Sequence, residues 1–328
     1  MRILGVVIFV LAALSAARST PELRASEPAS GRTTATLEPD PAIPCSMCDA
    51  WNVPRKPFPV FGNTYFVGTL GLSSVLIATD QGLVLMDVAL PQSAPLIDAN
   101  LRALGFKTAD VKYILTSHAH FDHLGGVRSM RRFTGATVMA SASTARALAL
   151  GHPVPEDPQF GTGPLDAFPA ITDGVRVMQD GETFALGGTR ITMRHTPGHT
   201  PGATTWTWTS CAGSRCLDMA YVDSLTAVAK DEYRYTDVPG LVDTFRATLR
   251  KVATLPCDVV LSTHPSATGM DEKVATRARA NIAPGADLDP FVDPKACAAL
   301  AERSEKALDA RVASEIASRP AAGAPPYP

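Results

Sequence analysis

The chain has little net charge and, after its first twenty residues, no long apolar run. Its 30 lysines and arginines nearly balance its 32 aspartates and glutamates. The sequence therefore lacks the excess of positive charge that would indicate binding to nucleic acid or to an anionic membrane surface, and we expect neither partner. No later stretch is long and apolar enough to cross a bilayer. The function must therefore be inferred from local clusters of side chains.

The N-terminus predicts a secretory signal peptide over residues 1–17. Arg2 precedes an apolar run from Ile3 to about Ala17, which ends in small residues. This run is shorter than the ~20 residues that a membrane anchor needs, and no cysteine for a lipid anchor follows it closely. We therefore expect a mature protein in the periplasm or outside the cell, without membrane attachment after cleavage.

That compartment permits disulfides, and the six cysteines are even in number. Cys211 and Cys216 bracket a short turn between two strand-like runs, where a bridge would join the tip of a hairpin. Cys257 and Cys297 lie forty residues apart. A bridge closing that loop would contribute roughly 3–4 kcal/mol to stability.

Composition predicts one domain between two flexible ends. Residues 18–44 are rich in Pro, Ser, Thr and Ala without periodicity, which indicates a disordered leader, and 319–328 form a similar tail. No repeat or linker interrupts residues 45–318, so we expect a single domain there. Cys45 and Cys48 at its start form a C-x-x-C without the βαβ context of a redox motif. Either a local bridge or two loosely paired thiols fits that position.

Strand-like and helical segments alternate along this domain. Strands are expected at 63–69, 73–79, 82–88, 111–117, 136–140, 190–194, 203–209, 217–222 and 258–263, and helices at 94–104, 124–133, 143–150, 241–253, 271–280 and 294–316. This interleaving predicts an α/β fold whose sheet faces are covered by helices. Residues 151–169 form a Pro/Gly-rich loop of a length that is usually functional or mobile.

Histidine is scarce, yet three of the seven lie in one short turn, H118-A-H120-F-D122-H123. Alternate side chains of extended backbone share a face, so His118 and His120 point together. After the turn, Asp122 and His123 can face a second position nearby. Imidazole and carboxylate are zinc ligands. The Gly125-Gly126 pair that follows is expected to let the backbone turn tightly into a helix.

Two further histidines follow strand-like runs. His199 lies in "TPGHTPG", and His264 follows the apolar "VVLST". Ligand sites gather at strand ends in α/β sheets. Five histidines and one aspartate are enough for two sites of three protein ligands each, with a position at each ion left for water. We expect His152 to be a loop residue and His195 to have a supporting or surface role.

A metal pair predicts hydrolysis without a covalent enzyme nucleophile. Metal binding lowers the pKa of water toward neutrality, and a close pair can also polarise a carbonyl and stabilise the leaving group. The sequence has no G-x-S-x-G and no S-x-x-K motif, so a serine mechanism has no support. Hydrolysis by metal-bound hydroxide is the simplest interpretation.

These residues resemble the signature of the metallo-β-lactamase superfamily, and of its class B, subclass 3 β-lactamases in particular. Beyond the six ligand-type residues, the resemblance rests on "WNVPRKPFPVFGNTYFVGT", "GHTPGATTWTW", "YVDSLTA" and "THPSATG", which are spread over residues 45–318. It implies a four-layer αβ/βα sandwich with a two-zinc site between its sheets. It also implies a secreted enzyme that hydrolyses the amide of penicillins, cephalosporins and carbapenems and confers antibiotic resistance.

The resemblance also implies a role for each ligand. The first zinc would be held by His118, His120 and His199, and the second by Asp122, His123 and His264. A hydroxide between the two ions, beside the catalytic carboxylate of Asp122, would attack the β-lactam carbonyl. Subclass 3 relatives often carry a disulfide matching Cys257–Cys297, and some carry one matching Cys211–Cys216. Some pair a cysteine near Cys45 with one near position 70, which is leucine here.

Further residues of the family pattern concern the substrate. Ser224 stands where other subclasses have a cysteine ligand. Ser224 and Thr226 would bind the substrate carboxylate, while Trp51 and Gln159 would line the cleft. The alternative for the two hydroxyls is an Asx-type turn closed by Asp223. We expect a monomer that binds a small-molecule β-lactam.

Two other functions fit the same residues less well. A lactonase or glyoxalase II-like thioesterase of the superfamily would use an aspartate matching Asp223 as a bridge between both metals. A zinc-binding scaffold with a dead site would need no complete ligand set, whereas all six ligands are present here. The shapes of the 151–169 loop and of the Trp51 segment, which would set the preference among β-lactams, do not follow from the sequence.

Overall fold

The computed structural model describes residues 36–319. The expected signal peptide, the leader up to residue 35 and the tail from residue 320 lie outside the described residues. The chain separates into two units, Met1–Thr36 and Leu37–Pro328, and the following description concerns the second. Within the described range no helix has the length and apolar character needed to cross a membrane.

Residues 37–44 differ from the disordered leader that their composition predicts. Leu37 is buried, and so is the carboxylate of Asp40. Arg128 and Arg132 pair with that carboxylate at 2.7 and 3.1 Å. Two guanidinium groups thus compensate its burial and fix this short segment on the domain, so the ordered part begins before Cys45.

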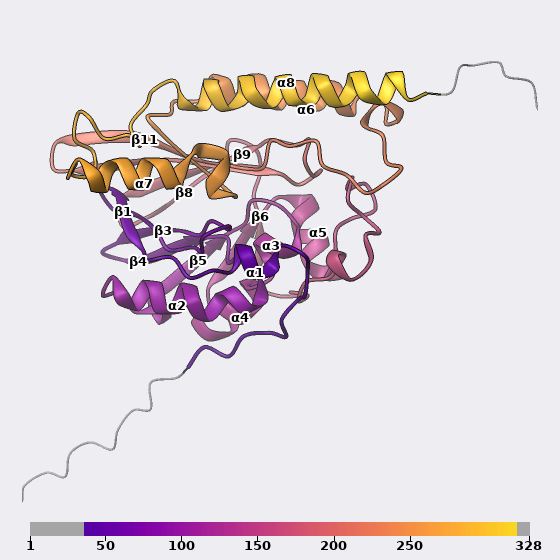
Figure 1. Ribbon diagram of the computed structural model, residues 1–328. Coiled ribbons are helices and arrows are strands. Elements are labelled where there is room, and N and C mark those ends of the chain that lie inside the picture. The colour runs from indigo at the N-terminus through magenta and orange to yellow at the C-terminus, as the bar shows by residue number, and fades with distance from the viewer. Residues whose placement is uncertain (1–35, 320–328) are drawn as a thin grey trace, which may run out of the picture. The chain divides into compact units, whose positions relative to one another are not determined.

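Twelve strands within residues 36–319 form two sheets (Figure 1). The first has the order β1-β2-β3-β4-β5-β6-β7, and the second has the order β12-β11-β10-β9-β8. The first sheet comprises β1 (Phe58–Phe61), β2 (Thr64–Phe66), β3 (Val75–Thr79), β4 (Gly82–Met86), β5 (Val111–Leu115), β6 (Thr137–Ala140) and β7 (Val175–Val177). The second comprises β8 (Thr183–Leu186), β9 (Thr189–His195), β10 (Thr204–Ala212), β11 (Arg215–Val222) and β12 (Val259–Ser262).

Each sheet changes from antiparallel to parallel pairing along its width. β1 to β4 form antiparallel hairpins, and β4 to β7 pair in parallel. β8 to β11 are antiparallel, and β12 joins β11 in parallel. The parallel pairs need helical crossovers, and these supply the helices between the strands.

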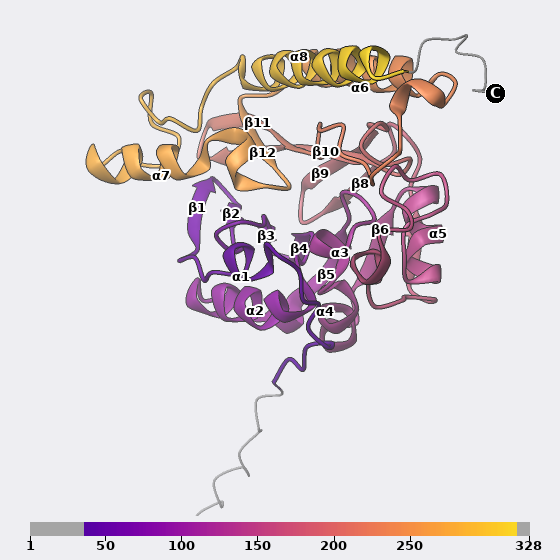
Figure 2. The ribbon, with the colours of Figure 1, turned by 45° about the vertical axis from the view of Figure 1, so that its right-hand side comes forward.

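The eight α-helices described lie mainly on the outer sides of the sheets (Figures 1 and 2). They are α1 (Cys48–Trp51), α2 (Ala94–Ala103), α3 (Phe121–Leu124), α4 (Val127–Thr134), α5 (Ala142–Leu150), α6 (Leu241–Ala253), α7 (Met270–Arg279) and α8 (Ala296–Ala317). α2 and α4 cover the first sheet, whereas α6 and α8 pack together on the second. The fold is therefore the expected four-layer αβ/βα sandwich.

Three apolar clusters separate the four layers. One lies between the first sheet and its helices, with Leu85, Ile97 and Val127 among its members. The central one joins the inner faces of both sheets. The third joins the second sheet to α6 and α8. Because both faces of each sheet are buried, several strands carry continuous apolar runs, as in "VVL" of β12.

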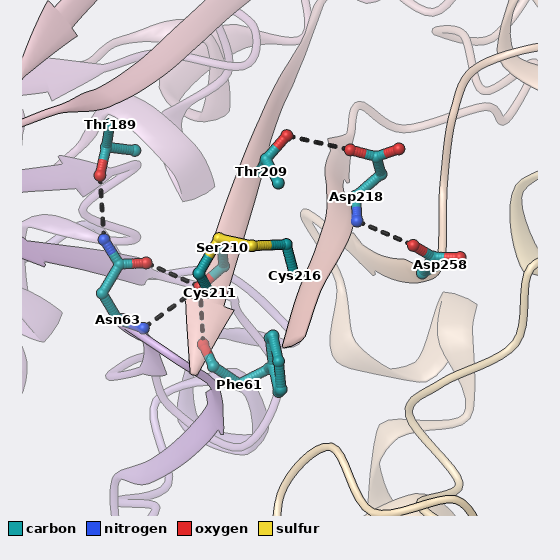
Figure 3. Close-up of a disulfide and its surroundings, with 9 residues drawn as sticks. All are labelled: Phe61, Asn63, Thr189, Thr209, Ser210, Cys211, Cys216, Asp218 and Asp258. Atoms are coloured by element: carbon teal, nitrogen blue, oxygen red, sulfur yellow. Dashed lines mark hydrogen bonds between the residues drawn. A yellow bond between two sulfur atoms is a disulfide. The ribbon is translucent and has the colours of Figure 1, made fainter. Parts of the chain in front are cut away.

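Polar contacts tie the two sheets together within the central layer. The indole of Trp206 donates to the carbonyl of Thr116 at 3.0 Å, and that of Trp208 donates to the hydroxyl of Thr64 at 3.0 Å. Near the tip of the β10–β11 hairpin, the backbone N–H of Asn63 donates to the hydroxyl of Ser210 at 3.2 Å (Figure 3). Buried indoles with hydrogen-bond partners fix how one sheet lies on the other.

All six cysteines are paired in the structure, as Cys45–Cys48, Cys211–Cys216 and Cys257–Cys297. Cys211–Cys216 closes the β10–β11 hairpin (Figure 3). Cys257–Cys297 ties the chain before β12 to the first turn of α8. The C-x-x-C is thus a local bridge rather than two loosely paired thiols.

Candidate metal centre

The six expected ligands come from three segments that follow strands. H118-A-H120-F-D122-H123 follows β5 of the first sheet, whereas His199 and His264 follow β9 and β12 of the second. All six line one cleft of about 290 Å³. The site therefore depends on both sheets, and neither sheet alone supplies a complete set.

The first expected ligand set is compact. One donor atom each from His118, His120 and His199 lies within 4.8 Å of the others. The ring centroids are separated by 4.6 to 5.0 Å, and the rings meet nearly edge to face. All three side chains are buried. Three imidazoles gathered in this way form a half-shell in which one ion can contact all three.

The second set lies beside the first and is less tightly gathered. Oδ2 of Asp122 lies 3.3 Å from Nε2 of His123 and 3.5 Å from Nε2 of His264. The rings of the two histidines are 5.0 Å apart. Asp122 and His123 also fall within 4.8 Å of a donor atom of His118, so the two sets adjoin.

Four of the five imidazoles use their other ring nitrogen to contact an oxygen. Nδ1 of His118 lies 2.6 Å from Oδ1 of Asp223, and Nε2 of His120 lies 3.2 Å from Oδ1 of Asp157. The partners of the other two are backbone carbonyls, Thr226 for Nδ1 of His199 at 2.8 Å and Gly71 for Nδ1 of His264 at 3.2 Å. Such outer contacts set the tautomer and orientation of metal-binding histidines.

The buried ring nitrogens that have no hydrogen-bond partner fit a metal pair. Nε2 of His118 is buried and has no hydrogen-bond partner in the described structure, and the same holds for both ring nitrogens of His123. Buried polar atoms are costly unless they are satisfied. A cation held by these lone pairs would satisfy them, so the donors present suit zinc.

The electrostatics favour neutral imidazoles at His118, His199 and His264, whereas Asp122 and Asp87 raise the pKa of His123 despite its burial. Burial, together with the neighbouring histidines, lowers the pKa of His118 well below its ordinary value. Burial and His120 lower the pKa of His199 to about 3, and burial and His123 lower that of His264 to about 4. Burial alone would raise the pKa of Asp122, but the adjacent His123 holds it below its ordinary range. Neutral imidazoles and an ionised carboxylate are the forms that bind metals.

The glycines after the cluster serve a different purpose from the expected tight turn. Gly125 and Gly126 have helical φ angles of −54° and −86°, which any residue adopts. A Cβ on Gly125 would lie 2.4 Å from Cδ of Pro91, and one on Gly126 would lie 2.5 Å from the carbonyl oxygen of Val88. Close packing of α3 and α4 on the chain after β4 therefore requires these glycines, whereas backbone conformation does not.

The four expected substrate contacts also line this cleft, namely Trp51, Gln159, Ser224 and Thr226. The hydroxyl of Ser224 is 2.7 Å from that of Thr263, and Thr226 is exposed. The carboxylate of Asp223 contacts His118 on the side away from the cluster. It therefore orients that ring rather than closing an Asx-type turn.

Two histidines lie apart from the cluster, as expected. Nδ1 of His152 lies 2.7 Å from the carbonyl of Pro153, and Nε2 of His195 lies 3.0 Å from that of Pro201. Neither lines the cleft. Both therefore have structural partners of their own.

The sequence did not single out two buried aspartates beside the cluster. Asp157 contacts His120 from the Pro/Gly-rich loop. Asp87 accepts hydrogen bonds from the amide and hydroxyl of Ser117 at 2.8 and 2.6 Å and from the hydroxyl of Tyr221 at 2.8 Å. It thereby fixes the start of the histidine turn. The one available signal for Asp157 was its place in a long loop, and no motif marked Asp87.

The chain is similar to metallo-beta-lactamases both in sequence and in fold. Residues 67–211 match the model of the metallo-beta-lactamase superfamily. Among solved structures, Rm3 metallo-beta-lactamase is 42% identical with a TM-score of 0.79, and the match covers 83% of this chain and 99% of that one. MEM-A1, a subclass B3 metallo-beta-lactamase from a soil metagenome library, is 41% identical with a TM-score of 0.77, over 82% and 100% of the two chains.

A curated relative is similar over a shorter stretch. A probable metallo-hydrolase of Burkholderia pseudomallei (strain 1710b) is 32% identical over 117 residues. That match spans 35% of this chain and 36% of the relative, so the chain covers about a third of the length of the Burkholderia protein.

Proposed function

This chain belongs to the metallo-beta-lactamase superfamily, and from that premise we propose that it is a subclass B3 β-lactamase that opens the β-lactam ring by hydrolysis. The proposal extends to penicillins, cephalosporins and carbapenems, and to antibiotic resistance as the consequence for the cell. The observation that carries it is the convergence of five histidines and one aspartate in a single cleft.

We assign two zinc ions to the cleft. His118, His120 and His199 would hold one, and Asp122, His123 and His264 would hold the other. When bound, such a pair supplies an acidified water and a Lewis acid for a carbonyl oxygen. Hydrolysis adds one water: its oxygen bonds to the carbonyl carbon, the ring C–N bond breaks, and the nitrogen gains a proton.

The chain's own residues orient and hold the reactants. The carboxylate of Asp122, kept ionised by His123, accepts a hydrogen bond from the attacking water and is its candidate proton acceptor. Asp223 and the carbonyl of Thr226 keep the rings of His118 and His199 in place. Fixed ligands need no reorganisation during the reaction, which lowers its barrier.

Hydroxyl groups would recognise the carboxylate of the substrate. None of the described side chains that line the cleft is a lysine or an arginine. The cleft is lined by three hydroxyl side chains, those of Thr162, Ser224 and Thr226, and Thr162 lies in the 151–169 loop. Trp51, whose ring centroid is 5.4 Å from that of His264, offers an apolar wall for a substituent.

We place the enzyme in the periplasm or outside the cell. The N-terminal seventeen residues have the features of a cleaved signal peptide. The three disulfides fit an oxidising compartment.

The lactonase or thioesterase alternative depends on Asp223 bridging two ions. Asp223 is fully buried, and its Oδ1 contacts the outward nitrogen of His118. That position supports an orienting role instead of a bridging one, and it therefore favours the β-lactamase.

The experiment uses the purified mature protein with a chromogenic cephalosporin, a lactone and a thioester, each with and without a chelator. We expect cephalosporin turnover that the chelator abolishes and added zinc restores. Turnover of the lactone or the thioester alone would support the alternative hydrolase. Failure to hydrolyse any of the three substrates would indicate a binding protein.

A further inference from the structure

We propose that Asp157 is a positioning residue that couples the 151–169 loop to the ligand His120. This inference rests on the proposed function, because it assumes that His120 binds a metal. It adds a link between the wall that faces the substrate and the first ligand set.

One carboxylate oxygen joins the two parts. Oδ1 of Asp157 lies 3.2 Å from Nε2 of His120 and accepts a hydrogen bond from the backbone N–H of Gln159 at 2.9 Å. The carboxylate of Asp157 is 1% exposed, so water does not compete for these contacts. The same atom thus fixes a ligand ring and the backbone of a residue that lines the cleft.

The contact determines which nitrogen of His120 faces the cluster. With Nε2–H donating to Asp157, Nδ1 is the nitrogen whose lone pair an ion would bind, and Nε2 of Gln159 lies 3.5 Å from it. His118 and His199 have the opposite arrangement, since each directs Nδ1 to its outer partner. His120 therefore depends on an acceptor at one particular place, and Asp157 is the residue that supplies it.

The loop is built around the same residue. The N–H of Asp157 donates to the carbonyl of Val154 at 2.9 Å, and the N–H of Phe160 donates to the carbonyl of Asp157 at 3.0 Å. The N–H of Lys230 donates to the carbonyl of Pro158 at 3.0 Å, which anchors the loop to the segment after β11. The side chain of Gln159 reaches to 3.5 Å from Nδ1 of His120. Loop position and ring position are therefore set together.

Coupling of this kind is reciprocal. If the loop holds His120 in a metal-binding orientation, metal bound at His120 must hold the loop by the same free energy. Loss of the carboxylate should therefore weaken the binding of the first ion and make the loop more mobile at Gln159. The second ligand set, which does not contact Asp157, should keep its affinity.

The test compares Asp157→Asn and Asp157→Ala with Glu156→Gln. Glu156 is the neighbouring residue, is exposed, and pairs only with Arg146 on the surface. Zinc affinity is measured by competition with a chelator in the otherwise native chain and in a His264→Ala background, which isolates the first ion. Hydrogen exchange at the amide of Gln159 is followed with and without zinc.

We expect Asp157→Ala to weaken binding of the first ion by roughly 10- to 100-fold, Asp157→Asn, which keeps an acceptor oxygen but loses the charge, to weaken it less, and Glu156→Gln to have no effect. Zinc should slow exchange at the backbone amide of Gln159 in the native chain but not in Asp157→Ala. The inference is overturned if folded Asp157→Ala binds zinc like the native chain, or if Glu156→Gln weakens binding equally. A native chain that binds zinc but does not hydrolyse cephalosporins would instead contradict the proposed function.

Discussion

His264 is the expected ligand whose loss should disturb the fold least. Its side chain is 28% exposed, whereas those of Asp122 and His123 are 8% and 1% exposed. Its side chain contacts Oδ2 of Asp122, the carbonyl of Gly71 and the rings of Trp51 and His123. It therefore contributes to the site more than to the core.

Replacement of His264 by alanine should lower occupancy of the second ion and slow cephalosporin turnover while leaving the fold intact. Elemental analysis and circular dichroism measure these effects. His152→Ala is the matched control, because His152 contacts only the loop around Pro153 and Phe160. Two ions per chain retained in His264→Ala would show that this residue is not a ligand.

The sequence identified the five histidines and one aspartate that the structure brings together in one cleft, but not the residues that orient their rings. Spacing after strands was enough to select His118, His199 and His264, because a strand end fixes where the next side chain lies. The partners Asp157 and the carbonyl of Gly71 are distant in sequence from the rings that they contact. Backbone carbonyls carry no sequence signal, so these contacts could be found only in three dimensions.

Elements with strong periodicity or clear end signals were predicted closely, and short ones were missed. α6 covers residues 241–253, as its pattern predicts, and α5 ends at Leu150, where Gly151 follows as the cap with a left-handed φ of 77°. The strands β1, β7 and β8 have only three or four residues, and β1 contains Pro59. They form because neighbouring strands pair with them, which local sequence does not encode.

The two longer-range disulfides should differ in their effect on stability. Cys257–Cys297 closes a loop of sequence separation 40, and Cys211–Cys216 one of separation 5. Loop-closure entropy predicts that removing them with paired serines costs about 4 and about 2 kcal/mol, respectively. Urea unfolding of the two double variants measures the difference. Equal costs would mean that the loop length does not govern their contribution.

Glu315 of α8 should give the protein a pH-dependent contribution to stability. Burial alone would raise its pKa, but Arg311 and the amides of Tyr235 and Thr236 bring that pKa below its ordinary value of 4.5. A lowered pKa in the folded state means that the contribution is present above pH 4.5 and is lost as the pH falls further.

We therefore expect Glu315→Gln to lower the free energy of unfolding by about 1.5–3 kcal/mol near pH 7, with a smaller difference below pH 4. Unfolding by urea at both pH values measures it. The control is Glu302→Gln on the same helix, because Glu302 is 67% exposed and pairs only with Lys306. A difference that grows toward acid pH would contradict the assigned pKa direction.

At the scale of the whole molecule, the ligands join the two halves of the sandwich. Four come from the segment after β5 of the first sheet, and two come from segments after strands of the second. Alternating strands and helices predicted an α/β fold but not the number of layers, which only the family resemblance implied. The reason is that sheet-on-sheet packing depends on contacts between residues far apart in sequence, such as Trp208 and Thr64.

Because the ions would bridge both sheets, zinc should stabilise the folded protein. A ligand that binds only the folded state at 100 times its Kd adds about 2.7 kcal/mol per site. We expect the thermal midpoint to rise with zinc and to fall after chelation, as measured by calorimetry. Magnesium is the control ion, because it prefers oxygen ligands. An unchanged midpoint with zinc bound would mean that zinc binds the unfolded chain as tightly as the folded protein, which would contradict a site formed only when both sheets are in place.

The most direct test of a two-zinc β-lactamase is a zinc titration of the metal-free native protein while hydrolysis of a chromogenic cephalosporin is followed. We expect no hydrolysis without metal and a rise in activity that levels off at two equivalents bound per chain. Hydrolysis by metal-free protein, or zinc-saturated protein that leaves the β-lactam intact, would contradict it.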